Sequence, residues 1–467
     1  MKADFFEKYQ SGGREVCEGI PVWDEQRVQR VWFEGWLKQP LETVEGGRLW
    51  VVQPGFWRRG AGPDFQKAAV RFPDGSVRCG DVEVDLKPEN WTAHEHDENA
   101  EYDNVIVHAV WEAGRGGYFT STKSFTYVPQ VVMRTQLAID EMTLWSVLDE
   151  GSPEGWPMSV PGACRREFEQ LGRERLVAVL RSAGLYRLRR KGVRFYWRVR
   201  AVGGLQTLWE ALARGMGYHE NVVAFTALAQ CARIEEVSKL EGEAREAFLW
   251  GMADLLPENA TSIRDEEGKR YLKKLWSQWW MMRGEKMGRV LPRDLWVRRG
   301  GRPWNHPLRR LAGLCALSYR LEAIYEAIEG CDEKRFIENI VGREDYSFWM
   351  RRVSWWGRKL DKAYPLIGRA RAVELLVNVF WPWAVWGKDL GGFSEELLES
   401  RLLRLRCGWN HKTRIVYDRI VPPSIGRECL GNALMQQGLL QIYEDYCVRD
   451  ASACASCPFL GQIEAVS

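Results

Sequence analysis

Acidic side chains, a lysine and histidines gather in one stretch of this sequence, from Gly60 to His108. Asp64 follows a proline there, and residues 77–87 alternate acidic and aliphatic side chains near the end of the run. Such alternation predicts a β-strand with one polar and one apolar face. The polar side chains are Asp81, Glu83, Asp85 and Lys87. Grouped carboxylates bind Mg²⁺ or Mn²⁺, and a nearby lysine offsets negative charge, which is the chemistry that phosphodiester hydrolysis requires.

The elements that must position these residues are a hairpin, a central strand and a helix. Residues 67–72 have a strand pattern, and a Pro-Asp-Gly turn at 73–75 joins them to the acidic run. Residues 104–112 are apolar on both faces, which indicates a central strand, and they include His108. Asp24 stands where it would cap a helix whose apolar residues recur at helical spacing. Two more strands are predicted at 49–52 and 126–133.

A Pro-Asp pair ending at Asp64 is followed, after 20 residues, by the Asp-Leu-Lys that begins at Asp85. This order resembles the PD-(D/E)XK nuclease superfamily. The resemblance implies a restriction-endonuclease-like mixed sheet in which the two aspartates hold the metal and Lys87 orients water or offsets charge on the phosphate. It also implies that an upstream helix adds a glutamate, here Glu25. His108, on the neighbouring strand, would hold a leaving oxygen or orient a ligand.

One feature departs from that superfamily, which has a helix between the metal-binding strand and the next strand. Here residues 88–103 are short and polar, with room for little more than a turn or two. The acidic residues therefore also have a simpler interpretation, as the solvent-exposed side of an antiparallel strand.

His94 and His96 form an HxH motif within this polar segment. With His108 or Glu83 they would bind Zn²⁺ or another transition metal, as in a metal-dependent hydrolase of small substrates. The motif and a following glutamate also match the HxH-x4-E pattern of cupins, although cupin ligands lie on strands and this segment is too polar for one. Solvated loop histidines are the remaining interpretation.

The same residues, with others spread over most of the chain, resemble an uncharacterised bacterial family, domain of unknown function 2851. The matching stretches are GAGPDF, GDVEVDLKPENWTAHEHDENAEYDNVIVHAVWE, LWEALARGMGYHENVVAF, RPWNHPLRRLA and GNALMQQGLLQIYEDYC. That family has no established activity. Its members often carry His at the position of Asp85 and Arg at that of Lys87, so the resemblance favours Glu83 as the metal ligand.

A basic segment begins the helical part of the chain. Residues 165–200 contain 12 Arg and Lys against 3 Glu, and aromatic residues interleave with them. Cations and aromatic rings in this arrangement are typical of nucleic-acid-binding surfaces. The predicted partner is therefore nucleic acid, with DNA favoured over RNA. The predicted nucleic-acid-binding residues are Arg187, Arg189, Arg190, Lys191 and Arg194, with Arg302 from a second cluster that also includes Arg298, Arg299, Arg309 and Arg310. A salt-bridged helix face is the alternative.

Four cysteines near the C-terminus have the spacing of a metal site. Cys447, Cys454 and Cys457 are separated by six and two residues, and Cys429 lies one helix upstream. Four soft ligands fit a [4Fe–4S] cluster or Zn²⁺ in a structural role. The trio resembles the cluster loop of helix-hairpin-helix DNA glycosylases, and in part the iron–sulfur staple of some PD-(D/E)XK nucleases. Unligated cysteines are the alternative.

Length and composition set the frame for these sites. The chain has 467 residues, a net charge of +3 and no long apolar run or signal-peptide core, so we expect a cytoplasmic protein without a membrane partner. The predicted fold class is α+β. The predicted parts are a leader (1–24), an α/β metal-dependent nuclease domain (25–135), a basic helical domain (136–428) and a C-terminal helix with the cysteines (429–467). The leading prediction is a metal-dependent nuclease acting on DNA or RNA, and its rivals are a non-catalytic nucleic-acid-binding protein and the histidine-based hydrolase.

Overall fold

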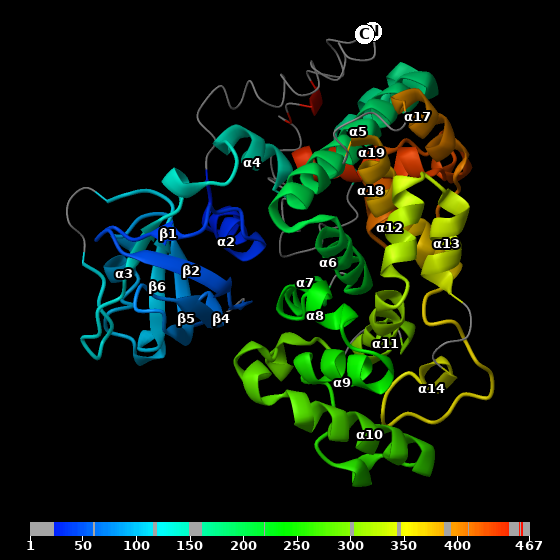
Figure 1. Cartoon of the computed structure of the whole chain (residues 1–467). Coiled ribbons are helices and arrows are strands. Elements are labelled where there is room, and N and C mark those ends of the chain that lie inside the picture. The colour runs from blue at the N-terminus through cyan, green and yellow to red at the C-terminus, as the bar shows by residue number, and fades with distance from the viewer. Residues whose placement is uncertain are drawn as a thin grey trace.

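The computed structural model describes residues 23–58, 61–114, 119–148, 161–218, 220–298, 303–342, 347–386, 394–409, 411–447, 457 and 459–460. The predicted leader lies outside these residues except for its last two. The described chain is α+β, as predicted, with one mixed sheet in the N-terminal third followed by helices (Figure 1). No described helix combines the length and the apolar character needed to cross a membrane.

Seven strands form the sheet, in the order β1-β2-β4-β5-β6-β7 with β3 beside β4. Their bounds are β1 Leu41–Glu42, β2 Arg48–Gln53, β3 Phe56–Trp57, β4 Phe65–Arg71, β5 Val77–Asp85, β6 Val105–Val110 and β7 Gln130–Val132. The pairs up to β5 are antiparallel, whereas β5–β6 and β6–β7 are parallel. A bridge between Thr43 and Val131 brings the two edges together, so the sheet curls nearly closed.

The predicted hairpin is confirmed: β4 and β5 pair antiparallel over most of their length. β6 lies between β5 and β7 and is buried along nearly all of its length, which confirms a central strand. β7 is shorter than the predicted 126–133. Tyr127 instead bridges Ser121, and the Val128 amide bonds the Thr120 carbonyl, so residues 126–128 belong to a separate turn.

Helix α2 (Glu25–Glu34) forms because Asp24 caps it, accepting a 2.8 Å hydrogen bond from the Arg27 amide. It packs on the sheet, and Val28 and Val31 join the same core as Val82 and Val84 of β5. The opposite face of β5 is covered by residues 86–104, which contain α3 (Asn90–Ala93) and a 3₁₀ turn. This connection is as short as predicted, and it buries the polar face of β5.

Helices make up the rest of the described chain. They are α4 Glu141–Val147, α5 Cys164–Val202, α6 Gly204–Met216, α7 Val222–Cys231, α8 Ile234–Ser238, α9 Gly242–Met252, α10 Glu266–Met282, α11 Pro307–Ser318, α12 Leu321–Glu329, α13 Glu333–Val341, α14 Ser347–Met350, α15 Arg369–Leu375, α16 Trp381–Trp386, α17 Glu395–Arg404, α18 His411–Ile420 and α19 Ala433–Ile442. A π-turn joins α15 to α16, and α5 is broken at Gly172. α5 and α19 pack closely because Gly184 and Gly438 leave no side chain between the two backbones.

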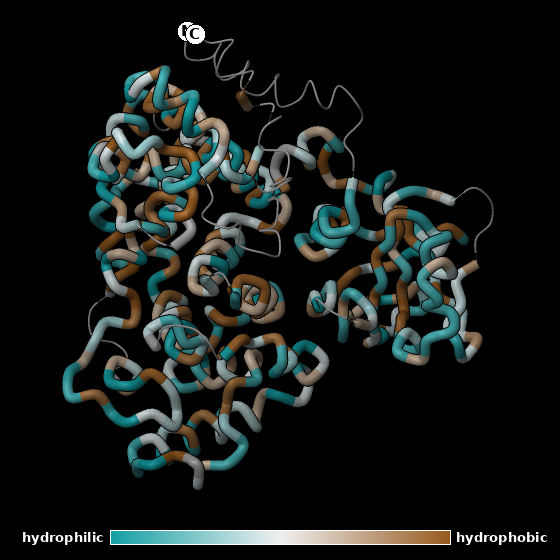
Figure 2. Tube along the Cα trace, turned by 180° about the vertical axis from the view of Figure 1, so that it is seen from behind, coloured by the Kyte–Doolittle hydropathy of each residue, from teal (hydrophilic) through white to brown (hydrophobic). Residues whose placement is uncertain are grey.

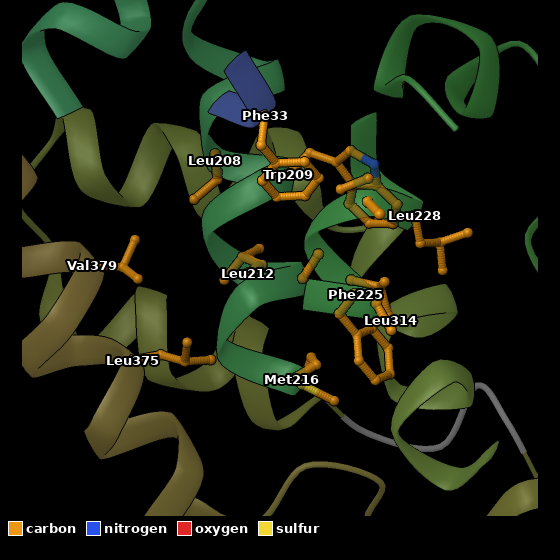
Figure 3. Packing of buried hydrophobic residues seen from close by; sticks show 14 of the residues in the cluster. Phe33, Leu208, Trp209, Leu212, Met216, Phe225, Leu228, Leu314, Leu375 and Val379 are labelled. Atoms are coloured by element: carbon orange, nitrogen blue, oxygen red, sulfur yellow. The ribbon is translucent and has the colours of Figure 1, made fainter. Parts of the chain in front are cut away.

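The sheet region and the helices meet along α2. Phe33 points onto α6 beside Leu208 and Trp209 (Figure 3). Gln230 of α7 donates to the Phe33 carbonyl at 3.2 Å, and Arg194 of α5 donates to Glu34 at 2.8 Å. Hydrophobic segments lie along the central strands and inside the helical region, with polar segments outside them (Figure 2). Helix α2 therefore contacts both the sheet and the helical region and connects the two.

Candidate metal centre

Asp64 lies beside Glu83 because of a bulge in the hairpin. Phe65 pairs with Val82 but Ala68 pairs with Gly80, so one extra residue stands on β4 between them. The Asp64 amide donates to Glu83 Oε2 at 3.0 Å, and the Val84 amide donates to Asp64 Oδ2 at 3.1 Å. The two carboxylates therefore share one end of the hairpin.

Asp85 lies two residues further along β5, where it is 1% exposed. Its Oδ2 is 3.1 Å from His108 Nε2, and its Oδ1 is 3.7 Å from His94 Nδ1. The other His108 nitrogen, Nδ1, is 3.0 Å from the hydroxyl of Thr120. His108 is thus held at both ring nitrogens and fixes the orientation of Asp85.

His96 closes the site from the covering segment. It is 7% exposed, stacks on Tyr102 with ring centroids 4.0 Å apart, and meets Trp91 edge-on. Its Nε2 lies 3.2 Å from Glu83 Oε1, yet this buried nitrogen has no aligned hydrogen-bond partner among the described residues. A buried imidazole nitrogen without a proton donor or acceptor is a candidate metal ligand.

Asp85, His94 and His96 each offer one ligand atom, and these atoms all lie within 4.8 Å of one another. One carboxylate and two imidazoles form a donor set that suits Zn²⁺, Mn²⁺ or Fe²⁺. Glu83 borders this trio through His96, and Asp64 borders Glu83. The residues present therefore fit a divalent transition metal, with oxygen ligands beside it for a second cation.

The ionisation of these groups reflects their burial. Burial raises the pKa of Asp64 to about 9 and that of Glu83 to about 8, and the neighbouring carboxylates push both in the same direction. Burial also lowers the pKa of His96, against the opposing pull of Asp85 and Glu25. The imidazole is thus held neutral, as a ligand must be, while the crowded carboxyl groups favour their protonated forms, and a bound cation would favour their ionised forms instead.

Glu25 and Gln29 extend the cluster from α2. Gln29 Nε2 donates to Asp64 Oδ1 at 2.7 Å and to Glu25 Oε1 at 3.1 Å. Partial burial raises the pKa of Glu25, and the charge of Asp85 adds to the rise, so this surface carboxylate interacts electrostatically with the site. The upstream glutamate expected from the nuclease resemblance is therefore near the other acids.

Several predicted residues have other positions or roles. The interpretation of the acidic face as solvent-exposed is wrong, because Asp81, Glu83 and Asp85 are buried under residues 86–104. Asp81 accepts a 3.0 Å bond from the Lys67 amide and so holds the bulge. Lys87 lies past the end of β5, exposed and without an ion pair among the described residues.

Some members of the site could not be singled out from the sequence. Trp91, Tyr102, Gln29 and Thr120 hold ligands or other site residues, and none belongs to a recognised motif. Two signals existed: Trp91 is a large apolar residue within a polar segment, and Gln29 stands one helical turn after Glu25. The HxH segment forms a turn after α3 and not a strand, unlike cupin ligands.

The predicted nucleic-acid-binding residues of α5 mostly face inward. Arg187, Lys191 and Arg194 are half-buried and bond to other side chains, whereas Arg189 is exposed. Of the second cluster, Arg302 lies outside the described residues. Arg309 is 1% exposed and donates to backbone carbonyls, so its assignment to a binding surface is wrong. For the α5 residues, nucleic-acid binding stays a prediction.

The predicted cysteine site lies largely outside the described residues. Cys454 and the side chain of Cys429 are among those not described, while Cys447 and Cys457 are half-buried. The prediction of a [4Fe–4S] cluster or Zn²⁺ therefore stays a prediction.

Comparison with known proteins gives one match. A family model described as "Protein of unknown function (DUF2851)" matches residues 25–402, which include the whole candidate metal centre. No curated protein matches the chain, and no solved structure does.

Proposed function

Since the chain belongs to this family of proteins of unknown function, we propose its activity from the site itself: metal-dependent hydrolysis of phosphodiester bonds, with nucleic acid as the leading substrate. The observation that carries the proposal is the convergence of Asp85, His94 and His96 beside the buried carboxylates of Glu83 and Asp64. Among the described residues, these acids and the neutral histidine have no lysine or arginine partner, an arrangement typical of a cation site.

Asp85, His94 and His96 would hold the metal, and Glu83 and Asp64 would complete its surroundings. When bound, a divalent ion supplies an activated water and neutralises charge on a phosphate. Glu83, whose pKa is raised to about 8, is suited to accept and return a proton near neutral pH. His108 is fully buried, so it orients Asp85 and does not touch a substrate.

The arrangement supports a restriction-endonuclease-like site in which the residues of the (D/E)xK motif differ from those that the spacing indicated. The order is that of the superfamily: a helix bearing Glu25, then Asp64 on a hairpin, then acids on the next strand. The bulge pairs Asp64 with Glu83, so Glu83 takes the role of the (D/E) residue and Asp85 stands two residues later, at the lysine position. Lys87, exposed at the rim, is left to contact the phosphate.

Metal content and cleavage test the proposal together. Wild type, Asp85→Asn and His96→Asn are compared with Glu98→Gln, a carboxylate exposed on the same covering segment. We expect Asp85→Asn and His96→Asn to contain about one tightly bound transition metal per chain less than wild type and Glu98→Gln. Cleavage of linear, circular and single-stranded DNA and of RNA, with Mg²⁺, Mn²⁺ or Zn²⁺, should follow metal content.

A second candidate, hydrolysis of small phosphate esters, is favoured by the inward position of the α5 cations. It predicts turnover of bis-p-nitrophenyl phosphate without cleavage of any nucleic acid. If wild type binds metal but hydrolyses neither substrate class, the centre is structural. Nucleic-acid binding without hydrolysis would then favour the non-catalytic binding protein.

A further inference from the structure

A separate cavity of about 320 Å³ lies where α2 meets the helical region. Its walls come from α2, α5, α6, α7, the α15 segment with the π-turn after it, and the end of α19 with the turn that follows. A volume of this size is at the lower end for small-molecule sites, which often form between structural regions. None of the metal-centre residues lines it.

The lining of this cavity carries seven basic side chains against four carboxylates, an excess of three positive charges. Each carboxylate is bonded to an arginine already. Arg198 binds Glu210 through two nitrogens, at 2.8 and 3.0 Å, and Arg194 binds Glu34 at 2.8 Å. Arg187 and Arg371 bind the remaining two, Glu444 and Glu374. Within the lining itself, the four carboxylates thus offset four of the seven positive charges.

Lys191 lies among these arginines and donates to neutral amide oxygens, at 2.6 Å on Asn378 and 3.0 Å on Gln437. Arg371 is largely enclosed and pairs with Glu374, yet its buried Nε and Nη2 have no hydrogen-bond partner among the described residues, and burial lowers its pKa although Glu374 opposes that shift. An anion in the cavity would relieve the cost of burying this charge.

Part of the cavity wall is apolar. Phe195, Leu375 and Val379 form this part, and Leu375 and Val379 point towards α6 (Figure 3). A ligand that satisfies both the cations and the apolar part of the wall has a compact, multiply charged end and an apolar or ring-shaped end. A phosphate monoester carries up to two negative charges and a diphosphate about three, which matches the excess on the lining.

We propose that this cavity binds a small phosphorylated molecule, a nucleotide or another organic phosphate or diphosphate, at a site independent of the metal centre. Arginines hold the phosphate oxygens, and the apolar wall holds the organic part. A volume of about 320 Å³ fits a single small molecule and not a strand of nucleic acid.

The test uses the full chain and measures binding by isothermal titration and by thermal unfolding. The probes are inorganic phosphate, pyrophosphate, nucleoside mono- and diphosphates, and sulfate at matched ionic strength. We expect a phosphate or diphosphate probe to bind with micromolar affinity and to raise the unfolding temperature, with sulfate giving little effect. Nucleoside diphosphate should bind more tightly than pyrophosphate, because only the nucleotide uses the apolar wall.

Two variants and one control test whether the ligand binds in the cavity. Lys191→Gln removes one charge, and Ala211→Leu fills the cavity without changing its charge, so each should weaken binding about tenfold or more. Arg189→Gln, an exposed residue of the same helix outside the lining, should bind as wild type. Circular dichroism and the ligand-free unfolding temperature show whether each variant folds.

Equal binding by all three variants would overturn the proposal, as would the absence of binding by any phosphate probe. Loss of oligonucleotide binding in Lys191→Gln, without binding of small phosphates, would assign these cations to nucleic acid instead. No metal-centre residue lines the cavity. A protein that fails to hydrolyse any substrate would therefore leave the phosphate-binding result unaffected.

Discussion

Replacing Glu83 by glutamine should stabilise the metal-free protein. Burial raises the pKa of Glu83 from 4.5 to about 8, so the folded protein keeps a proton that the unfolded chain has released. For a raised carboxyl pKa, stability falls as pH rises from about 4.5 to about 8. One pKa unit corresponds to about 1.4 kcal/mol, so the cost at about pH 7.5 reaches up to about 4 kcal/mol. Relaxation of the site lowers this cost, and we expect Glu83→Gln to raise the free energy of unfolding by about 2–4 kcal/mol.

Glutamine suits the position for a geometric reason. Its carbonyl oxygen can keep the bond that the Asp64 amide donates to Glu83 Oε2 at 3.0 Å. Its amide nitrogen takes the place of Oε1, which lies 3.2 Å from Nε2 of His96, and can donate to this nitrogen, which has no hydrogen-bond partner in the part of the chain that the structure describes. The substitution also removes an ionisable neighbour whose charged form raises the pKa of Asp64. No cavity or clash is expected, because the two side chains have nearly the same shape.

Urea unfolding in the presence of a chelator, at several values between about pH 5 and 8.5, measures the effect. The advantage of Glu83→Gln over wild type should be small at the acidic end and grow towards neutral pH. Asp74→Asn is the control: this exposed carboxyl in the hairpin turn has its pKa lowered by bonds from Ser76, so its loss should bring no such gain. A Glu83→Gln protein that is less stable than wild type at every pH would refute the assignment of Glu83 to a buried, strained acid.

Three further outcomes are expected. Affinity for Zn²⁺ or Mn²⁺, from competition with a chelating dye, should rise with pH up to about 9, because the raised pKa values of Asp64 and Glu83 make metal compete with protons. Gly438→Ala should lower unfolding free energy by about 1–3 kcal/mol, because the new Cβ would lie 2.0 Å from the Leu180 carbonyl oxygen; Gly284→Ala, in open space, should not. If the C-terminal cysteines hold a [4Fe–4S] cluster or Zn²⁺, anaerobic preparations should contain iron and sulfide or zinc, and Cys454→Ser should lose them.

The hairpin and the central strand were predictable because the sequence pattern of a strand reflects the surroundings of its two faces. Alternating polar and apolar residues indicate one buried face, and apolar residues on both faces indicate a central strand. The error concerned the polar face of β5. Alternating acids look alike whether they face water or a covering loop, and the cover here is the polar segment that contains α3. Only Trp91 and Tyr102, buried within it, indicate that this segment packs down on the strand.

The pairing of the acids could not be predicted, because it depends on one residue. Without the bulge on β4, the pairing of Ala68 with Gly80 would continue and place Asp64 opposite Val84, facing the other side of the sheet. Lys67 adopts a positive φ of 55° at the bulge, and Asp81 accepts its amide hydrogen. Neither residue type indicates a bulge, so a spacing motif alone pairs Asp64 with Asp85, whereas the fold places Glu83 opposite Asp64.

For the basic segment too, the sequence shows which charges are present but not which way the side chains point. Composition correctly indicates an excess of cations in α5, but the direction in which they point is decided by acids far away in the sequence. Glu34 of α2 lies 160 residues from Arg194, and Glu444 lies 257 residues from Arg187. These partners turn the cations inward, and they leave the positive excess inside a cavity instead of on a surface. Since α2 supplies Gln29 to the candidate metal centre and Glu34 to the cavity, one ten-residue helix contributes to both places, and its sequence shows only a cap and an apolar stripe.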